Sequence, residues 1–546
     1  MLRLHEIRLP LDHAPEALDH AVAERLGAPA LGFTVVRRGY DARNPRRIVL
    51  SYTLDVEVAD EAAVLTKGPA QVREAPDMAY RPVATAPEGL TERPIVVGTG
   101  PCGLFAALIL AQSGFRPIIL DRGKQVRERT KDTWDLWRRG ILHPESNVQF
   151  GEGGAGTFSD GKLHSQIRDP FHFGRKVLEE FVKAGAPEEI LYVSKPHIGT
   201  FRLVQMVESI RETIESLGGE YRFGSRVDDL MIQGGALAGV VLQTGERIAA
   251  RHVVLAIGHS ARDTFAMLHG HGVAMRAKPF SIGVRIEHPQ SLIDRDRFGS
   301  NAGHPLLGAA DYRLVHHASN GRDVYSFCMC PGGTVVAAAS EPNRVVTNGM
   351  SQYSRNERNA NAGIVVGITP DDYPGGPLAG IEFQRHWEAK AFEAGGGGYV
   401  APAQRVGDFL AGRASTALGE VVPSYRPGLK PTDLTACLPD FVVTALREAL
   451  PAFDRDLPGF TLADAVMTGV ETRTSSPLRI ERGEDCQSLS TPGLFPAGEG
   501  AGYAGGILSA GVDGIRVAEA VALAMTGGGP VRSSGRHAET ATVPYG

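Results

Sequence analysis

Residues 95–104 read IVVGTGPCGL. The three leading apolar residues predict a buried strand, the glycines follow the pattern Gly-x-Gly-x-x-Gly, and the apolar residues after them recur at helical spacing. A second apolar run follows this predicted helix and ends in Asp121. A strand, a glycine turn, a helix and a distant acid in this order form the fingerprint of a dinucleotide-binding unit. The alternative is a glycine-rich turn in an ordinary α/β domain.

Each fingerprint residue has an expected physical role. Gly98 permits the tight turn, and Gly100 lets the backbone approach a pyrophosphate at the helix N-terminus, where free N–H groups and the helix dipole favour anions. Gly103 allows the helix to pack closely on the strand. Asp121 is expected to accept hydrogen bonds from a ribose diol.

A second glycine-rich segment, residues 151–162, reads GEGGAGTFSDGK. Its glycines are too frequent for the interior of a helix or strand, and such a loop suits close approach of backbone to a ligand. A flexible surface loop is the alternative. The candidate cofactor contacts in this loop are Gly153, Gly154, Gly156, Thr157, Phe158 and Ser159.

A third segment, residues 493–507, combines an apolar strand with a glycine-rich turn before a long apolar helix. A Rossmann dehydrogenase that holds NAD does not need such a distant segment, whereas a bound flavin benefits from contacts with it. Two-electron reduction puts negative charge on the N1–C2=O edge of the isoalloxazine, which the amides of Gly505, Gly506 and Ile507 would stabilise at a helix N-terminus. FAD is therefore the predicted cofactor. The other candidate contacts are Pro101, Cys102, Arg122, Gly258, Gly498 and Glu499.

The order of these segments resembles the FAD-binding domain of the glutathione-reductase-like superfamily, and more narrowly a bacterial family of uncharacterised FAD-dependent dehydrogenases. The resemblance implies FAD and the fold, and little about the substrate. Two departures are Asp121, where the superfamily usually has Glu, and Glu499, where it usually has Asp. The motifs that carry the resemblance are Gly151–Lys162, Phe327–Gly333, Val346–Ser351, Gly398–Gln404 and Glu471–Pro477.

The predicted fold is α/β: a Rossmann-like FAD-binding domain, with a parallel sheet and a β-meander, an inserted α+β substrate domain and a small N-terminal α+β module. A strand at residues 253–257 is expected to return to the nucleotide sheet. The tail is rich in Gly, Ser and Thr and is predicted to be disordered. The predicted boundaries are 1–88 for the module, 89–274 and 461–525 for the FAD-binding domain, 275–460 for the insertion and 526–546 for the tail.

Four side chains are candidates for the chemistry, although none is an unmistakable catalytic base. Cys328 and Cys330 form either a redox disulfide or two reduced cysteines beside the flavin; on a regular strand they lie about 7 Å apart, at the edge of disulfide reach. Lys162 is either a proton donor or a solvated loop residue.

Arg473 is the fourth candidate. It binds either an anionic substrate group or the flavin O2 edge, or else it forms a structural ion pair with Glu471 or Glu499.

Charge and cysteine usage exclude several classes of protein. The 57 basic and 62 acidic residues give a net charge of -5, which provides no general attraction to nucleic acid or anionic membrane. The 5 cysteines show no metal-type spacing and suggest a reducing, cytoplasmic compartment. No secretory signal or run of transmembrane length is present. No metal or membrane partner is expected.

The predicted function is an FAD-dependent oxidoreductase that transfers hydride between flavin N5 and a small organic substrate. No second fingerprint is visible, so electrons come either directly from the substrate or from an NADH or NADPH that visits the flavin transiently. A flavin-dependent RNA-modifying enzyme is an alternative, because arginines cluster at residues 37–47, which read either as a solvated hairpin tip or as an anion site. A flavin-bound, non-catalytic or sensory module is another. The oligomeric state is left open.

Overall fold

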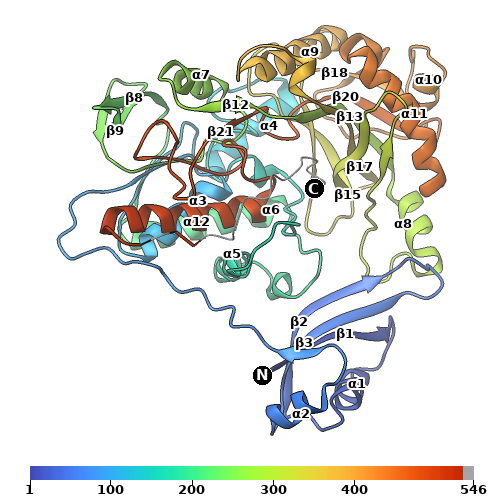
Figure 1. Ribbon diagram of the computed structural model, residues 1–546. Coiled ribbons are helices and arrows are strands. Elements are labelled where there is room, and N and C mark those ends of the chain that lie inside the picture. Colours follow the sequence, from blue (N-terminus) through green and yellow to red (C-terminus); the bar gives the residue numbers. More distant parts are fainter. Residues whose placement is uncertain (530, 533–546) are drawn as a thin grey trace.

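The computed structural model describes residues 1–529, 531 and 532. It is a mixed α/β structure built around a parallel sheet of five strands in the order β22-β11-β5-β6-β7 (Figure 1). If the five strands are numbered along the chain and read across the sheet from β7 to β22, their order is 3-2-1-4-5. The direction of the order therefore reverses between β5 and β11. The strands are β5 (Ile95–Val97), β6 (Ile118–Leu120), β7 (Glu220–Arg222), β11 (Val253–Leu255) and β22 (Leu494–Pro496).

Helices cover one face of the parallel sheet. α3 packs along α12, which lies beside it in Figure 1, and Gly514 makes the contact close, since a Cβ there would lie 2.2 Å from the carbonyl oxygen of Cys102. α3 begins after Gly100 with proline in its first turn, which the fixed φ of proline favours. The helices on this face are α3 (Pro101–Gln112), α5 (Phe173–Lys183), α6 (Thr200–Ser216) and α12 (Ile507–Thr526).

An antiparallel meander covers the other face. Apolar side chains of the meander and of the parallel sheet form one buried cluster, so the nucleotide sheet is sandwiched between two layers. β7 pairs with β6 of the parallel sheet and not with the meander, and β11 returns to the parallel sheet as expected. The meander consists of β8 (Val227–Gln233), β9 (Ala236–Leu242) and β10 (Arg247–Ala249).

A second, eight-stranded sheet belongs to the inserted region. The predicted boundary at residue 460 falls before β20, yet β20 pairs with β13 and β18, so this sheet extends to Glu471. Helices α8 (Gln290–Phe298), α9 (Ala379–Gly395), α10 (Val406–Leu410) and α11 (Asp440–Asp456) surround it. The strands are β13 (Phe280–Pro289), β14 (Val315–His317), β15 (Asp323–Ala337), β16 (Thr347–Ser351), β17 (Asn359–Ile368), β18 (Ala401–Arg405), β19 (Leu429–Pro431) and β20 (Val466–Glu471).

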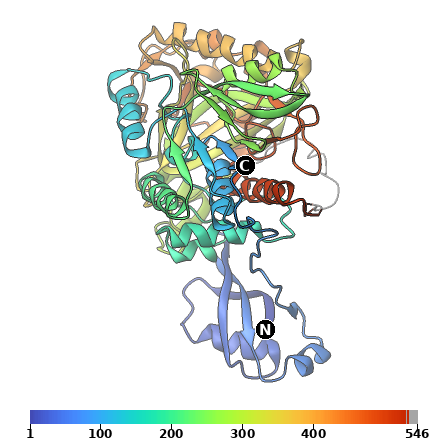
Figure 2. The same cartoon turned by 90° about the vertical axis from the view of Figure 1, so that its left-hand side faces the viewer.

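The N-terminal residues form a β-α-β-β-α-β unit with strand order β2-β3-β1-β4, which projects from the body in Figure 2. Of its clustered arginines, Arg43 pairs with Asp41 and Arg38 lies over the ring of Tyr192, so these two are engaged within the chain. Its elements are β1 (Leu2–Pro10), α1 (Ala17–Leu26), β2 (Gly32–Asp41), β3 (Val49–Glu57), α2 (Glu61–Lys67) and β4 (Val72–Glu74).

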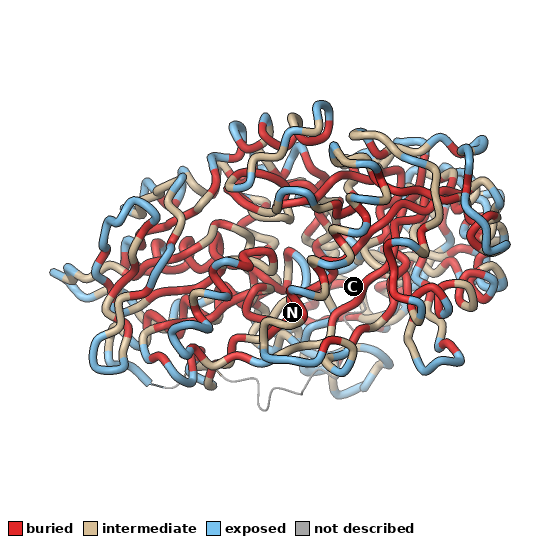
Figure 3. The backbone as a smooth tube through the Cα atoms, turned by 90° about the horizontal axis from the view of Figure 1, so that it is seen from above, coloured by how far each residue is buried: buried red, intermediate tan, exposed pale blue. Residues whose placement is uncertain are grey.

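The remaining elements connect the two large sheets. In sequence α4 (Val126–Arg139) follows β6, α7 (Arg262–Gly270) lies between β11 and β13, and β12 (Met275–Ala277) pairs with β21 (Leu478–Ile480). Buried backbone runs through the interior of the molecule, and exposed backbone lies on the peripheral loops (Figure 3). The predicted disordered tail falls largely outside the described residues. Within residues 1–529 and 531–532, no helix combines the length and apolarity needed to cross a membrane.

Candidate functional site

One large cavity of about 1270 Å³ connects the two sheets. Its lining extends from the carboxyl ends of β5 and β11 to β15 of the large sheet. Ligands of open parallel sheets bind outside the carboxyl ends of the strands, where the strand order reverses, which is the position of this cavity. The predicted residues that line it are Gly98, Gly100, Pro101, Cys102, Asp121, Arg122, Gly154, Gly156, Ser159, Lys162, Gly258, Cys328, Arg473, Gly498, Glu499, Gly505, Gly506 and Ile507.

The fingerprint turn requires its glycines sterically. Gly98 has φ 97°, and a Cβ there would lie 2.3 Å from the carbonyl oxygen of Ala256 on the neighbouring strand. A Cβ on Gly103 would lie 1.9 Å from the carbonyl oxygen of Gly98, so Gly103 serves packing and does not reach the cavity. The turn therefore presents backbone alone at the N-terminus of α3, which suits a bound pyrophosphate.

A fully buried arginine holds the glycine-rich loop against this turn. Arg129 of α4 donates hydrogen bonds to the carbonyl oxygens of Asn147 (2.7 Å), Val148 (2.7 Å), Glu152 (2.6 Å) and Gly154 (2.9 Å). Burial lowers the pKa of Arg129 to about 10. Sequence reasoning missed this residue because it lies in a polar helix and its partners are carbonyls, which leave no signature in the sequence.

Three predicted contacts in the loop serve its packing instead. The Phe158 ring packs edge-on against Trp137 and lies under the Arg129 guanidinium, 4.9 Å from it. A Cβ on Gly153 would lie 2.1 Å from the hydroxyl oxygen of Thr157, so those two residues fit against each other. Gly153, Thr157 and Phe158 thus shape the loop from behind, since its cavity face is formed by Gly154, Gly156 and Ser159.

Asp121 lines the cavity but is already engaged. One carboxylate oxygen accepts hydrogen bonds from the backbone N–H (3.0 Å) and the hydroxyl of Thr99, and the other accepts from the N–H of Gly123 (2.8 Å). Asp121 therefore braces the fingerprint turn, and a ribose diol would share its oxygens with these donors. The adjacent Arg122 pairs with Glu145 and Asp263 and lies 4.2 Å from the centre of the Phe150 ring.

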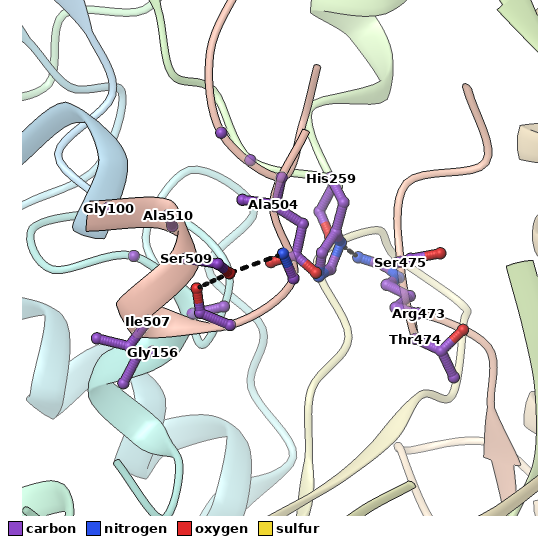
Figure 4. A pocket seen from close by; sticks show the side chains of 18 of the residues that line it. Gly100, Gly156, His259, Arg473, Thr474, Ser475, Ala504, Ile507, Ser509 and Ala510 are labelled. Atoms are coloured by element: carbon purple, nitrogen blue, oxygen red, sulfur yellow. Dashed lines mark hydrogen bonds between the residues drawn. The ribbon is translucent and has the colours of Figure 1, made fainter. Parts of the chain in front are cut away.

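The N-terminus of α12 forms another glycine surface. A Cβ on Gly505 or Gly506 would meet no atom of the described residues within 4 Å, so substituents there would project into open space. The N–H of Gly505 donates to the hydroxyl of Ser509 (3.0 Å), as Figure 4 shows. Since Gly505 is engaged in this way, the predicted helix-terminus site relies more on Gly506 and Ile507.

The ion pair predicted for Arg473 has a different partner. Arg473 pairs with Glu388 of α9 (3.1 Å), while Glu471 pairs with Arg285 (2.9 Å). Glu388 also pairs with Arg262 (2.7 Å), and these two guanidinium groups hold its pKa well below the usual range. Two cations therefore share one buried carboxylate. Arg473 lines the cavity at the side opposite α12 (Figure 4).

A half-buried acid and a half-buried amine face the cavity near this point. Burial raises the pKa of Glu499 to about 7 and lowers that of Lys278 to about 8, and each moderates the shift of the other through its charge. Lys278 also donates to the hydroxyl of Ser475 (3.4 Å). Such pKa values near neutrality suit groups that exchange protons with a bound molecule. Sequence reasoning did not single out Lys278, because no recognisable motif surrounds it.

The cysteine pair does not lie on a regular strand. The pairing of β15 with β17 shifts register on both sides of Cys330, and Cys328 has φ 44°. Cys328 lines the cavity, whereas Cys330 is buried behind it. Lys162 donates from Nζ to the carbonyl oxygen of Met329, so the predicted loop lysine is tied to the cysteine strand rather than solvated.

The cavity thus has glycine backbone at three points: the fingerprint turn, the glycine-rich loop and the start of α12. The first two surfaces pack against each other, since a Cβ on Gly154 would lie 2.7 Å from Gly100 Cα, whereas Gly505 and Gly506 leave open space. Together they present backbone rather than side chains along one cavity, which suits an extended dinucleotide. The arrangement defines a dinucleotide-binding α/β protein.

The comparisons with known proteins identify the family. This chain belongs to the same family as an uncharacterised protein of Clostridium beijerinckii, to which it is 47% identical over 529 residues, 95% of this chain and 98% of that protein. Residues 279–474 match the family described as "FAD-dependent protein, C-terminal domain-like", and residues 1–57 match a domain of unknown function. The chain is an FAD-dependent protein, and FAD is its cofactor.

Two solved enzyme structures are among those similar to this chain. An L-amino acid deaminase from Proteus vulgaris is 11% identical, with 83% of this chain and 94% of that chain covered and a TM-score of 0.36. A glycerol-3-phosphate dehydrogenase from Bacillus halodurans, complexed with FAD, is 14% identical, with 80% and 66% covered and a TM-score of 0.35.

Proposed function

We propose that the chain transfers hydride between flavin N5 and a small organic substrate bound against the eight-stranded sheet, with an FAD-binding domain of the glutathione-reductase-like type. The observation that carries this proposal is the continuity of one cavity from the fingerprint turn to the wall formed by β13 and β15. Its volume of about 1270 Å³ exceeds the usual 300–1,000 Å³ of a ligand pocket, which favours a cofactor and a substrate side by side.

FAD supplies the two-electron acceptor and donor when it is bound, and the chain supplies its position. In this proposal Gly98 and Gly100 present amides to the pyrophosphate, and Asp121 and Arg122 lie at the adenosine end. Gly506 and Ile507 present the positive end of α12 to the pyrimidine edge of the isoalloxazine, where reduction places negative charge. Backbone amides need no reorganisation during the reaction, so they stabilise this charge without loss.

Glu499 and Lys278 are the proposed proton-exchanging groups. Both lie in the cavity between the flavin segment and the large sheet. At neutral pH Glu499, with a pKa raised to about 7, is close to half-protonated, and Lys278, with a pKa lowered to about 8, is mostly protonated but loses its proton readily. Hydride transfer from a substrate leaves a proton to be removed, and a group of this pKa accepts it efficiently. Arg473, which lines the cavity and pairs with Glu388, supplies positive charge to the same wall, whereas Arg262 behind it also pairs with Glu341.

The substrate, the electron acceptor, a transient visit by NADH or NADPH, the oligomeric state and the cytoplasmic location stay predictions. The purified protein tests the cofactor and the reaction separately. We expect a yellow protein with about one FAD per chain, and anaerobic bleaching of the flavin by at least one compound in a panel of NADH, NADPH and small metabolites. A protein that takes up no FAD contradicts the cofactor site. A flavin that no compound in the panel reduces contradicts the proposed hydride transfer.

A further inference from the structure

We infer that Cys328 and Cys330 form a redox-active dithiol on the cavity wall, which exchanges two electrons with the bound flavin. This inference rests on the proposed function, because it requires FAD in the cavity. It adds a second redox centre to the protein and a class of electron donor or acceptor, the thiols and disulfides that react at such a pair.

The backbone around the pair is specialised. A β-bulge inserts extra residues into one strand, and bulges often re-aim a side chain beside an active site. Here β15 bulges between Phe327 and Gly333, and Cys328 adopts a left-handed conformation that is unusual for a residue with a side chain. On a regular strand the two sulfurs would stand about 7 Å apart along the chain. The bulge between Phe327 and Gly333 departs from that regular spacing. The Cys330 thiol contacts the carbonyl oxygen of Cys328 at 3.3 Å.

Neighbouring glycines make room for the inner thiol. A Cβ on Gly349 of β16 would lie 3.0 Å from Cys330 Sγ, and a Cβ on Gly333 would lie 3.2 Å from Cys330 Cβ. These contacts are tight, so a larger residue at either position would press on Cys330. The outer thiol, Cys328, has the cavity in front of it. The Cys328 sulfur is thus accessible to a reactant in the cavity, and the Cys330 sulfur lies behind it.

Two cations are held against the pair. Arg285 donates to the carbonyl oxygen of Cys328 (2.9 Å) and Lys162 donates to that of Met329. Arg285 is matched by Glu471, but Lys162 and Arg355 share the single carboxylate of Asp160, at 3.8 Å and 2.5 Å. The wall therefore has surplus positive charge, which stabilises a thiolate.

The titration of the pair follows from these neighbours. The neighbouring Cys330 thiol and the charges of Lys162 and Arg285 hold the pKa of Cys328 well below its usual range, although burial and the Asp160 carboxylate oppose the shift. The neighbouring Cys328 sulfur and burial raise the pKa of Cys330. A low-pKa outer thiol with a protonated inner partner is the arrangement that favours attack by the outer sulfur.

The redox step is balanced within the proposed holoenzyme. In the oxidising direction the two thiols lose two electrons and two protons and form one S–S bond, while FAD takes up the two electrons and two protons to give FADH₂. In the reverse direction FADH₂ reduces the disulfide. An external thiol or disulfide then exchanges with Cys328, the accessible sulfur, through a mixed disulfide.

Anaerobic titration of the oxidised holoenzyme with dithionite tests this directly. We expect four electrons per bound FAD in the wild type, two for the flavin and two for the disulfide, and two electrons per FAD in Cys328→Ser and Cys330→Ser. Cys437→Ser, which alters a buried cysteine outside the cavity lining, is the control and should titrate like the wild type. Two electrons per FAD in the wild type overturn the inference while leaving the flavin site intact; a protein without FAD refutes the proposed function instead.

A readout that needs no flavin accompanies the titration. Trypsin releases residues 323–344 as one peptide, which contains Cys328 and Cys330 and no other cysteine. After oxidation of the FAD-free protein by a small disulfide, the mass of this peptide should be lower by two hydrogen atoms. Its two cysteines should then no longer react with iodoacetamide. In the reduced FAD-free protein, iodoacetamide at about pH 6 should label Cys328 at least tenfold faster than Cys330. Equal, slow labelling and no mass loss overturn the dithiol.

Discussion

Replacing Arg129 by lysine should loosen the glycine-rich loop and weaken FAD binding. The guanidinium donates to four backbone carbonyls, two of them in the loop (Glu152 and Gly154) and two just before it, and it is completely buried against the ring of Phe158. A lysine ammonium keeps the charge but is a compact point donor without the planar fork of arginine. We therefore expect the variant to keep no more than two of the four hydrogen bonds.

The magnitude follows from those lost bonds. A hydrogen bond to a charged group contributes about 1.5–3 kcal/mol, so two lost bonds amount to about 3–6 kcal/mol. This is a large part of the roughly 5–15 kcal/mol that separates a folded domain from its unfolded state. If the loop must be ordered before FAD binds, the lower figure alone weakens FAD binding by about 100-fold, since about 1.4 kcal/mol corresponds to a tenfold change.

Flavin affinity and urea unfolding measure the two effects separately. FAD binding to the FAD-free protein is followed by quenching of flavin fluorescence, and unfolding by circular dichroism. Arg127→Lys is the matched control, because Arg127 lies on the same helix, is exposed and pairs at the surface with Glu208. The control should behave like the wild type. An Arg129→Lys protein that binds FAD within threefold of the wild type and unfolds at the same urea concentration would refute the reasoning.

Three further predictions concern other parts of the site. Glu388→Gln leaves Arg262 and Arg473 without their shared carboxylate and should lower the free energy of unfolding by about 3–5 kcal/mol, whereas Glu382→Gln, on the exposed side of the same helix, should not change it measurably in urea. Gly506→Ala places a methyl group in the cavity and should lower bound FAD at least tenfold; Gly527→Ala, which carries a similar positive-φ strain at the other end of α12, should destabilise the protein without this loss, and equal FAD content in the two variants contradicts the site. Because the pKa of Glu499 is raised to about 7, the folded protein binds more protons than the unfolded chain between about pH 4.5 and 7. The free energy of unfolding contributed by this group is therefore greatest at low pH and falls as pH rises through about 7. Glu499→Gln should remove that fall, and a pH profile of unfolding that is unchanged in the variant contradicts the assignment.

The dinucleotide site could be predicted from residues close together in the sequence. Gly98 and Gly100 lie on one turn, and the need for a positive φ or for space without a Cβ leaves a direct trace in residue type. The same holds for Gly506 before α12. Phe158, predicted as a cofactor contact, packs against Trp137. A phenylalanine beside such a loop packs equally well toward the cofactor or toward Trp137, and the choice depends on a helix elsewhere in the chain.

The catalytic side of the cavity depends on contacts between distant segments. Arg473 pairs with Glu388 rather than with its sequence neighbour Glu471, because the large sheet places α9 against it and turns Glu471 toward Arg285. Lys278 and Glu499 acquire their shifted pKa values only because both are half-buried in the same cavity.

The sequence by itself determined the cofactor and its binding turn, since backbone conformation and the absence of a side chain are local properties that glycine spacing records. Only the tertiary structure decided which charges pair, which groups titrate near neutrality and where β15 bulges at Cys328. Those properties depend on burial and on neighbours from other strands, and desolvation and strand register do not exist until the two sheets have come together.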